Sequence, residues 1–358
     1  MKILNYIKHH SNTWQEDFKK LHINIKTEGE YTLFKYDIDA DFSNPLVREA
    51  RGCILKNLNT IVCYPFNKFG NYGESYADKI NWKTAKVQEK IDGSIIKLWY
   101  DNDVWHISTN NVINAYTAPL NNSNKTYGQL FDEAVADVGL DYTILDTNYT
   151  YIFELVSPEN RVVINYPKTT IYHIGTRDNR TEKEVNMDIG VAKPKTYKLS
   201  SLEECIDAVQ MMNTNTTLDN IQNEGYVVVD KYYNRIKIKS KDYVQAAYFK
   251  GLMSLSDEKT LEIIKNGETE EICTYFPIFK DKINDINKKI HCLKVDMCIY
   301  CMKLERNLSR KDFALKHKQD KFFDLGIKYI YENTNIITLD FVDDYVDKLT
   351  TKKLISLL

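Results

Sequence analysis

The sequence predicts an α+β protein, in which a first domain of mostly antiparallel sheets with flanking helices is followed by an all-α domain. Between residues 87 and 239, short β-branched and aromatic runs alternate with turn residues, a pattern typical of strands. After about residue 243, apolar residues recur at alternating three- and four-residue spacings, a pattern typical of helices. We therefore expect domains at residues 1–245 and 246–358.

Each element follows from the same two patterns. Turn-length connections at 101–103 and 231–234 favour antiparallel pairing of the strands on either side. Strands are expected at 87–90, 95–100, 104–108, 151–156, 161–164, 170–174, 225–230 and 235–239, with helices at 14–21, 128–138 and 202–211. In the second domain, one long helix is expected to bury Ile283, Ile286, Ile290, Leu293, Met297, Tyr300 and Leu304.

The composition is that of an ordinary globular protein, with 43% hydrophobic and 27% charged residues in a chain of 358. Apolar runs are too short to cross a bilayer, and the first residues lack the apolar stretch of a signal peptide, so we expect no membrane association and a cytoplasmic location, the host cytoplasm if the protein is viral. Seven scattered cysteines argue against a disulfide framework. Cys298 and Cys301 are expected to be buried helix thiols rather than zinc ligands.

Charge gives a local signal only. The formal net charge of −2 provides no overall attraction to nucleic acid. Between residues 280 and 321, however, twelve Lys or Arg stand against six Asp or Glu. This surplus suits RNA phosphates, although a solvated helix face rich in lysine explains it equally well.

The motif that indicates chemistry is Lys90-Ile91-Asp92-Gly93-Ser94. A nucleophilic lysine must be neutral when it attacks, and free lysine titrates near pH 10.4, so its site must supply desolvation or nearby positive charge. Gly93 relaxes the turn, so that the backbone can approach a phosphate.

Carboxylates and further cations follow downstream. Glu154 interrupts an apolar strand, and Glu224 directly precedes another. Each is either a surface residue or a site residue, and two such carboxylates near one lysine would suit a hard cation and a ribose. Lys237 and Lys239 alternate in a strand and therefore share one face, where they form either a phosphate cradle or a solvated surface.

In their order along the chain, these segments resemble the covalent nucleotidyltransferase superfamily of ligases and RNA-capping enzymes. The string from Ile152 to Val163, with its Pro158-Glu159-Asn160-Arg161 tail, is similar to the extended third motif of the RNA ligase 1 family of T-even bacteriophages. Further matching positions are Arg51-Gly52, Phe66 to Asn71, Glu224 to Val227, Lys237 to Ser240, Tyr243 and Tyr36.

The resemblance implies a nucleotidyltransferase (ATP-grasp-like ligase) domain and an ATP-dependent RNA ligase that works through a lysyl-adenylate on Lys90 and an RNA-adenylate. It implies that Lys237 and Lys239 hold phosphates, Glu154 the ribose and Glu224 the metal. Tyr36 and Gly93 would contact the nucleotide, and Arg51 and Lys68 either the triphosphate or the RNA end. The implied cofactors are ATP and Mg²⁺, with Mn²⁺ as a substitute. The implied partners are a tRNA broken in its anticodon loop and an end-healing polynucleotide kinase/phosphatase.

Some positions depart from the family. Gly70 replaces a second aromatic residue, and the segment 108–111 lacks a basic residue. Glu270 and Glu271 lie where the family has paired acids, in a run typical of solvated surface. Two alternatives stay open: another covalent nucleotidyltransferase, namely a DNA ligase or an mRNA guanylyltransferase, and a catalytically inactive RNA-binding protein on the same fold. The helical tail disfavours the first, because those enzymes ordinarily carry an oligonucleotide-binding barrel there. The intact motif residues disfavour the second.

Overall fold

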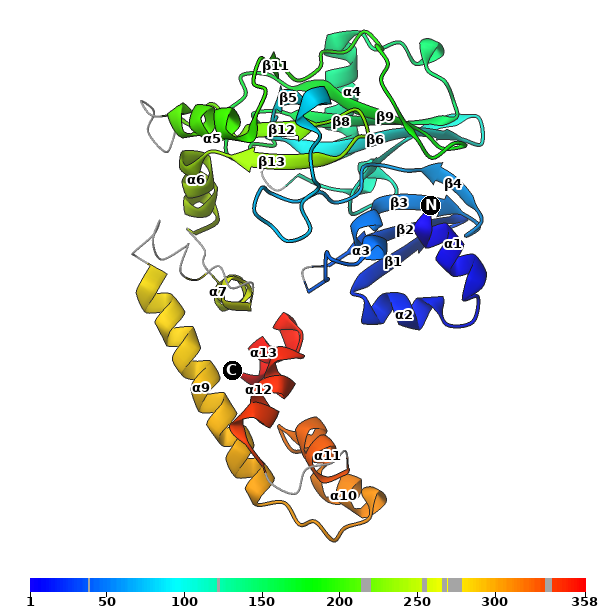
Figure 1. Cartoon of the computed structure of the whole chain (residues 1–358). Helices are drawn as coiled ribbons and strands as arrows, with labels where there is room; N and C mark the ends of the chain where they lie inside the picture. The colour runs from blue at the N-terminus through cyan, green and yellow to red at the C-terminus, as the bar shows by residue number, and fades with distance from the viewer. Residues whose placement is uncertain are drawn as a thin grey trace. The chain divides into compact units, whose positions relative to one another are not determined.

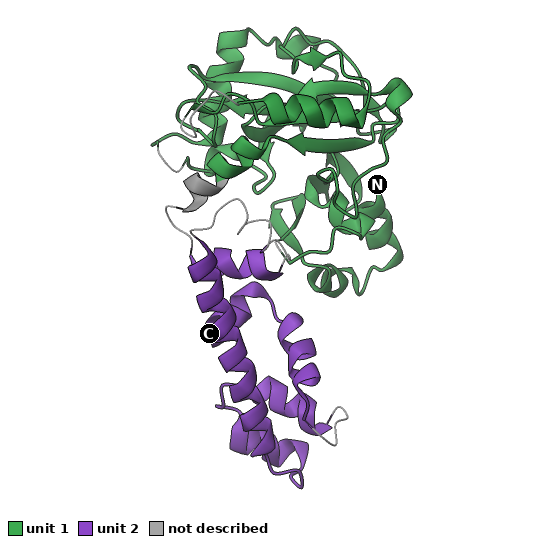
Figure 2. Ribbon diagram, turned by 60° about the vertical axis from the view of Figure 1, so that its left-hand side comes forward, with its two compact units in different colours: residues 1–250 green, residues 251–358 purple. Residues whose placement is uncertain are grey.

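The computed structural model describes residues 1–37, 39–120, 123–213, 220–252, 256–265, 269, 279–331 and 337–358. The chain forms two compact units, Met1–Lys250 and Gly251–Leu358 (Figure 2). The division thus falls five residues after the boundary expected from the sequence. Glu270 and Glu271 lie outside the described residues.

Unit 1 begins with a four-stranded antiparallel sheet that the sequence patterns did not reveal. Its strands β1 (Ile23–Glu28), β2 (Tyr31–Tyr36), β3 (Arg51–Lys56) and β4 (Thr60–Cys63) pair in sequence order. Helices α1 (Lys2–His9), α2 (Trp14–Lys20) and α3 (Pro45–Glu49) bury apolar side chains with this sheet in one core. Lys35 lies opposite Arg51 in the β2–β3 register, so this sheet brings Tyr36 and Arg51 to one end.

Two further antiparallel sheets complete unit 1 (Figure 1), as the turn signals predicted. The five-stranded sheet has the order β10-β9-β8-β6-β7, and the four-stranded sheet has the order β11-β5-β12-β13. The strands of the first are β6 (Ser94–Asp101), β7 (Val104–Thr109), β8 (Tyr149–Val156), β9 (Thr170–Asp178) and β10 (Glu184–Val185). Those of the second are β5 (Lys86–Glu89), β11 (Thr196–Tyr197), β12 (Gly225–Val229) and β13 (Arg235–Lys239).

Helices cover these sheets. Residues of α4 (Tyr127–Val138) share the core of the five-stranded sheet, and those of α5 (Leu202–Met211) share the core of the four-stranded sheet. The short helices η1 (Trp82–Thr84), η2 (Ala115–Thr117) and η3 (Tyr142–Ile144) lie in connections, and α6 (Lys241–Leu252) follows β13. The α+β fold class and three expected helices, α2, α4 and α5, are thus confirmed.

The expected strand at 161–164 is wrong. Its backbone pairs with a side chain instead of a neighbouring strand, because the amides of Val163 and Ile164 donate to Asp92 Oδ2 at 2.8 and 2.7 Å. Val163 and Ile164 are still buried, in a small core beside Tyr243, whereas Val162 is exposed. Burial, rather than strand pairing, therefore explains the apolar pattern.

Unit 2 contains only helices among its described residues. They are α7 (Asp257–Lys265), α9 (Lys280–Met302), α10 (Arg310–His317), α11 (Phe323–Tyr331), α12 (Leu339–Asp347) and α13 (Thr351–Leu357). As the periodicity predicts, α9 buries Ile283, Ile286, Leu293 and Met297. Cys298 and Cys301 lie in the same core, where burial raises the pKa of Cys301 to about 12. None of the helices in the described part of the chain is long and apolar enough to cross a membrane.

Gly225, the first residue of β12, lies where the neighbouring strand β13 approaches closely. Gly225 has φ +141°, and a Cβ there would lie 2.1 Å from Ile238 O on the neighbouring strand.

We expect Gly225→Ala to lower the free energy of unfolding by about 3 kcal/mol, because both the backbone and the strand contact must shift. Gly29→Ala is the matched control, with φ +59° and no heavy atom within 4 Å of the added carbon. It should cost about 1 kcal/mol. Urea unfolding measures both, and equal losses would contradict the steric argument.

Candidate active site

Lys90 and Glu224 meet because their strands pair. Lys90 directly follows β5, Glu224 directly precedes β12, and the Lys90 amide donates to Gly225 O at 2.9 Å. Lys90 Nζ donates to Glu224 Oε2 at 2.6 Å, and Lys239 Nζ lies 2.9 Å from Glu224 Oε1. The Glu224 side chain is only 2% exposed. One buried carboxylate therefore bridges two of the lysines singled out from the sequence.

Glu154 lies within β8 and completes this side of the site. Its Oε1 accepts a hydrogen bond from the Gly93 amide at 3.2 Å. Burial raises the pKa of Glu154 to about 7; the Lys90 charge lowers it and the Glu224 charge raises it further. A Cβ on Gly93 would lie 2.4 Å from Leu155 O. Glycine is therefore required there by the close approach of β8, a different reason from the turn expected from the sequence.

Asp92 fixes the loop after Lys90, a role that the sequence analysis did not assign. Besides the two amides of residues 163 and 164, its carboxylate accepts a hydrogen bond from Tyr243 Oη at 2.7 Å. The Asp92 amide donates to Tyr166 Oη at 3.1 Å. The loop that carries the lysine is thus tied to two distant segments. The motif contained Asp92, but nothing in the sequence identified its partners.

Arg51, Lys68 and Lys237 form a second group of cations. Burial, and then the charges of Arg51 and Lys68, lower the pKa of Lys237 to about 6. Burial and the Arg51 charge also lower the pKa of Lys68, and burial lowers the pKa of Arg51. Within the described residues, none of the three forms an ion pair. These desolvated cations repel one another, and only the charges of Glu74 and Glu154, beyond ion-pair distance, offset those of Lys68 and Arg51. Such an arrangement favours the binding of an anion.

Aromatic rings lie close to each of these cations. Phe69 lies below both Arg51 and Lys237, with its ring centroid 5.4 Å from the guanidinium carbon and 4.9 Å from Lys237 Nζ. Lys68 Nζ lies 5.4 Å from the ring centroid of Tyr36. The structure therefore brings all nine residues predicted for the site together in two adjoining groups, with Lys90, Gly93, Glu154, Glu224 and Lys239 in one and Tyr36, Arg51, Lys68 and Lys237 in the other.

In the part of the chain that the structure describes, two places offer oxygen or nitrogen ligands for a cation. His22, Asp37 and Asp39 bring one ligand atom each within 4.8 Å of one another, but these residues form no part of the Lys90 group. At the site itself, Glu224 offers carboxylate oxygens, and Mg²⁺ is commonly held by one or two carboxylates together with substrate phosphates. The donor chemistry at Glu224 therefore fits a hard cation.

The fold thus places a candidate nucleophile, Lys90, beside a group of cations suited to an anion. Comparison with known proteins gives the family. The model of the RNA ligase family matches residues 49–249. An RNA ligase of Rhodothermus phage RM378 is 31% identical over 219 residues, covering 50% of each chain. A protein named as a bifunctional polynucleotide kinase/RNA ligase, from Autographa californica nuclear polyhedrosis virus, is 30% identical over 288 residues. That match covers 74% of this chain and 40% of the viral protein.

The chain belongs to the RNA ligase family, which confirms the resemblance found in its motifs. It spans between 40% and 50% of the length of these two relatives. Among solved structures, an archaeal ATP-dependent RNA ligase is similar with a TM-score of 0.49 and 12% identity, covering 81% of this chain and 82% of the other.

The pKa of Glu154 makes stability depend on pH. A folded-state pKa near 7, raised from 4.5, means that the folded protein binds this proton more tightly, so the stabilisation is complete below pH 4.5 and is lost as the pH rises through 7. Glu154→Gln cannot ionise. We therefore expect the wild type to lose about 2 kcal/mol relative to this variant between pH 5 and pH 7.5. Urea unfolding of both proteins at the two pH values measures the difference, and a constant difference would show that Glu154 ionises normally.

Proposed function

We propose that the chain is an ATP-dependent RNA ligase that joins RNA 5′-phosphate and 3′-hydroxyl ends through a lysyl-adenylate on Lys90. The observation that supports this most is the pairing of one lysine with a buried carboxylate beside three unpaired cations. Lys90 Nζ contacts Glu224, while Arg51, Lys68 and Lys237 have no ion-pair partner among the described residues. A nucleophile next to a group of cations suits attack on an α-phosphorus.

The residues divide the work as follows. Lys90, as the neutral amine, attacks the α-phosphorus, pyrophosphate leaves, and the amine proton passes to solvent. Glu224 Oε2, 2.6 Å from Nζ, orients the amine. Arg51, Lys68 and Lys237 hold the phosphates, and Lys239 neutralises charge near the reacting group. Glu154 holds the ribose, and Tyr36 and Gly93 line the nucleotide. The adenylate then passes to an RNA 5′-phosphate, and a 3′-hydroxyl displaces AMP.

A divalent cation fits this site through Glu224. The carboxylate would hold Mg²⁺, with Mn²⁺ as a substitute, and the ion would supply neutralisation of the developing phosphate charge. The protein residues supply the positioning, since phosphoryl transfer depends mainly on alignment and charge.

The substrate proposal is finer. We infer a tRNA cleaved in its anticodon loop, with a polynucleotide kinase/phosphatase preparing the ends in the cytoplasm. The name of the viral relative, which joins a polynucleotide kinase to an RNA ligase, supports the kinase partnership. A joining assay that compares a nicked tRNA loop, a linear single strand and a nicked duplex tests the substrate, and preference for the nicked duplex would contradict it.

The nucleophile gives the first test of the function. Lys90→Ala should abolish covalent labelling by ATP, and Lys90→Arg should not restore it, because a guanidinium remains protonated. The exposed Lys86, four residues earlier, provides the matched control, and Lys86→Ala should label normally. The measurement is labelling with α-labelled ATP or GTP, followed by denaturing electrophoresis.

Three results of this assay would contradict the proposal in different ways. Label retained by Lys90→Ala would exclude Lys90 as the nucleophile. Label from GTP alone would favour a guanylyltransferase, and label from neither nucleotide would favour a catalytically inactive RNA-binding protein. A preference for nicked DNA in the joining assay would favour a DNA ligase.

We also propose that unit 2 binds RNA through its basic stretch at residues 280–321. Arg310 and Lys311 are exposed at the start of α10. Replacing both with serine should weaken joining of a structured tRNA and reduce the salt slope of RNA binding by up to about 1.5, because each lost phosphate contact releases one fewer counterion. Lys348→Ser with Lys352→Ser removes two exposed charges outside the stretch and is the control. Equal slopes for the two double variants would show that the stretch is only a solvated surface.

A further inference from the structure

Strand β13 carries three cations, Arg235, Lys237 and Lys239, at alternate positions that share one face. Lys239 pairs with Glu224 at 2.9 Å, and Arg235 pairs with Glu184 at 2.6 Å. Lys237 stands between them and has no ion pair within the part of the chain that is described. The two outer cations are thus compensated by buried carboxylates, and the middle one is left for an anion.

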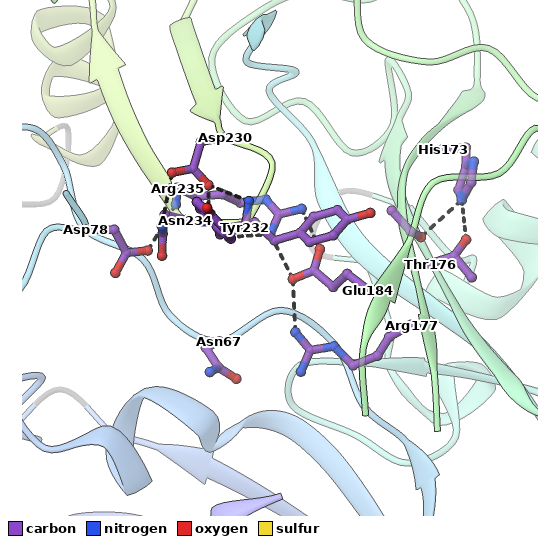
Figure 3. A network of polar contacts seen from close by, with 12 residues as sticks. Asn67, Asp78, His173, Thr176, Arg177, Glu184, Asp230, Tyr232, Asn234 and Arg235 are labelled. Carbon is purple, nitrogen blue, oxygen red and sulfur yellow. Dashed lines mark hydrogen bonds and ion pairs between the residues drawn. The ribbon is translucent and has the colours of Figure 1, made fainter. Parts of the chain in front are cut away.

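The Arg235–Glu184 pair joins the five-stranded sheet, through β10, to the four-stranded sheet that contains β13. Arg235 Nη1 and Nη2 donate to the two Glu184 oxygens at 2.8 and 2.6 Å, a forked geometry that fixes both groups. Glu184 lies opposite Arg177 in the β9–β10 register, and Arg177 Nη2 donates to it at 3.0 Å (Figure 3). The side chains of all three residues are at most 10% exposed. An edge strand of one sheet is therefore tied to an edge strand of the other.

The same arginine also holds the segment that leads to Lys68. Its guanidinium carbon lies 4.2 Å from the ring centroid of Phe66, and its amide donates to Asp78 Oδ2 at 3.0 Å. Phe66 in turn fills the space beside Gly175, where a Cβ would lie 2.4 Å from the ring. Arg235 therefore packs against the residue two positions before Lys68 and lies two positions before Lys237.

The backbone carries this constraint into the site. The Lys237 amide donates to Gly70 O at 3.0 Å, and the Tyr72 amide donates to Lys237 O at 2.8 Å. The segment with Lys68 and Phe69 thus runs beside β13, and both are anchored at the same end by Arg235. Movement of that arginine would displace Lys237 and Lys68 together relative to Arg51.

We propose that Arg235, held by Glu184, is a positioning residue that sets the place of Lys237 in the anion site and thereby the strength of nucleotide binding. The inference rests on the proposed function, in which Lys237 binds the nucleotide phosphates. Neither Arg235 nor Glu184 was singled out from the sequence, because an acid in the polar run 180–184 resembles solvated surface. Arg235 and Glu184 affect nucleotide binding through Lys237. This effect can therefore be distinguished from a general loss of stability.

The test is a double-mutant cycle on covalent labelling by ATP. Glu184→Gln should raise the ATP concentration for half-maximal labelling about tenfold and change maximal labelling less than about threefold, because it affects binding rather than chemistry. Arg235→Lys keeps the charge but loses the fork, and should raise that concentration about threefold. In a Lys237→Met background, Glu184→Gln should add no further rise, because coupled residues act non-additively.

The control is Tyr31→Phe, which removes a 2.6 Å hydrogen bond to Asp101 elsewhere in unit 1 and should leave labelling unchanged. The same rise from Glu184→Gln in both backgrounds, or a fall in maximal labelling alone, would overturn the proposal. If circular dichroism shows Glu184→Gln unfolded, Arg235→Lys takes its place in the cycle. If the wild type is not labelled, the proposed function fails, and calorimetry with inorganic tripolyphosphate then runs the same cycle on anion binding alone.

Discussion

The site depends on an imbalance of buried charge. Five cations, Arg51, Lys68, Lys90, Lys237 and Lys239, lie close enough to affect one another. Glu224 forms ion pairs only with Lys90 and Lys239, and the charges of Glu154 and Glu74 offset those of Arg51 and Lys68 only in part. Desolvated like charges repel strongly, so such an arrangement persists only where the surrounding structure fixes each group. The elements of unit 1 around the site fix these charged groups. The two four-stranded sheets and the segment between β4 and β5 deliver the cations, and aromatic rings and backbone hydrogen bonds hold them in place.

Fixation comes from contacts that leave little freedom. The pairing of β5 with β12 sets the distance between Lys90 and Glu224, and the buried Asp92 carboxylate ties the lysine loop to residues 163, 164 and 243. At Gly93 and Gly225, neighbouring backbone occupies the space that any side chain would need. The site is therefore built more by close approach of strands than by flexible loops, which suits a reaction whose catalysis is mainly positioning.

The sequence predicted those features that depend on local pattern. Alternation placed Lys237 and Lys239 on one face of β13, and helical spacing identified α9. The first sheet, β1–β4, was missed because only β1 alternates clearly, whereas β2, β3 and β4 are short runs buried without alternation. The segment 161–164 was misassigned because a carboxylate distant in sequence, rather than a strand, satisfies its amides. Motif order singled out the candidate site residues, which the fold brings together. The partnership of Arg235 with Glu184 joins positions 51 residues apart and leaves no local signal.

The absence of ion pairs at Arg51, Lys68 and Lys237 among the described residues affects the stability of the folded protein. Because the folded chain keeps these cations together with only partial compensation from Glu74 and Glu154, any multivalent anion that binds there relieves repulsion present only in the folded state. A ligand at a hundred times its Kd adds about 2.7 kcal/mol to the free energy of unfolding. Phosphate and sulfate buffers should therefore raise the melting temperature while competing with substrate. Under the proposed function, bound nucleotide would protect the protein against proteolysis in the same way.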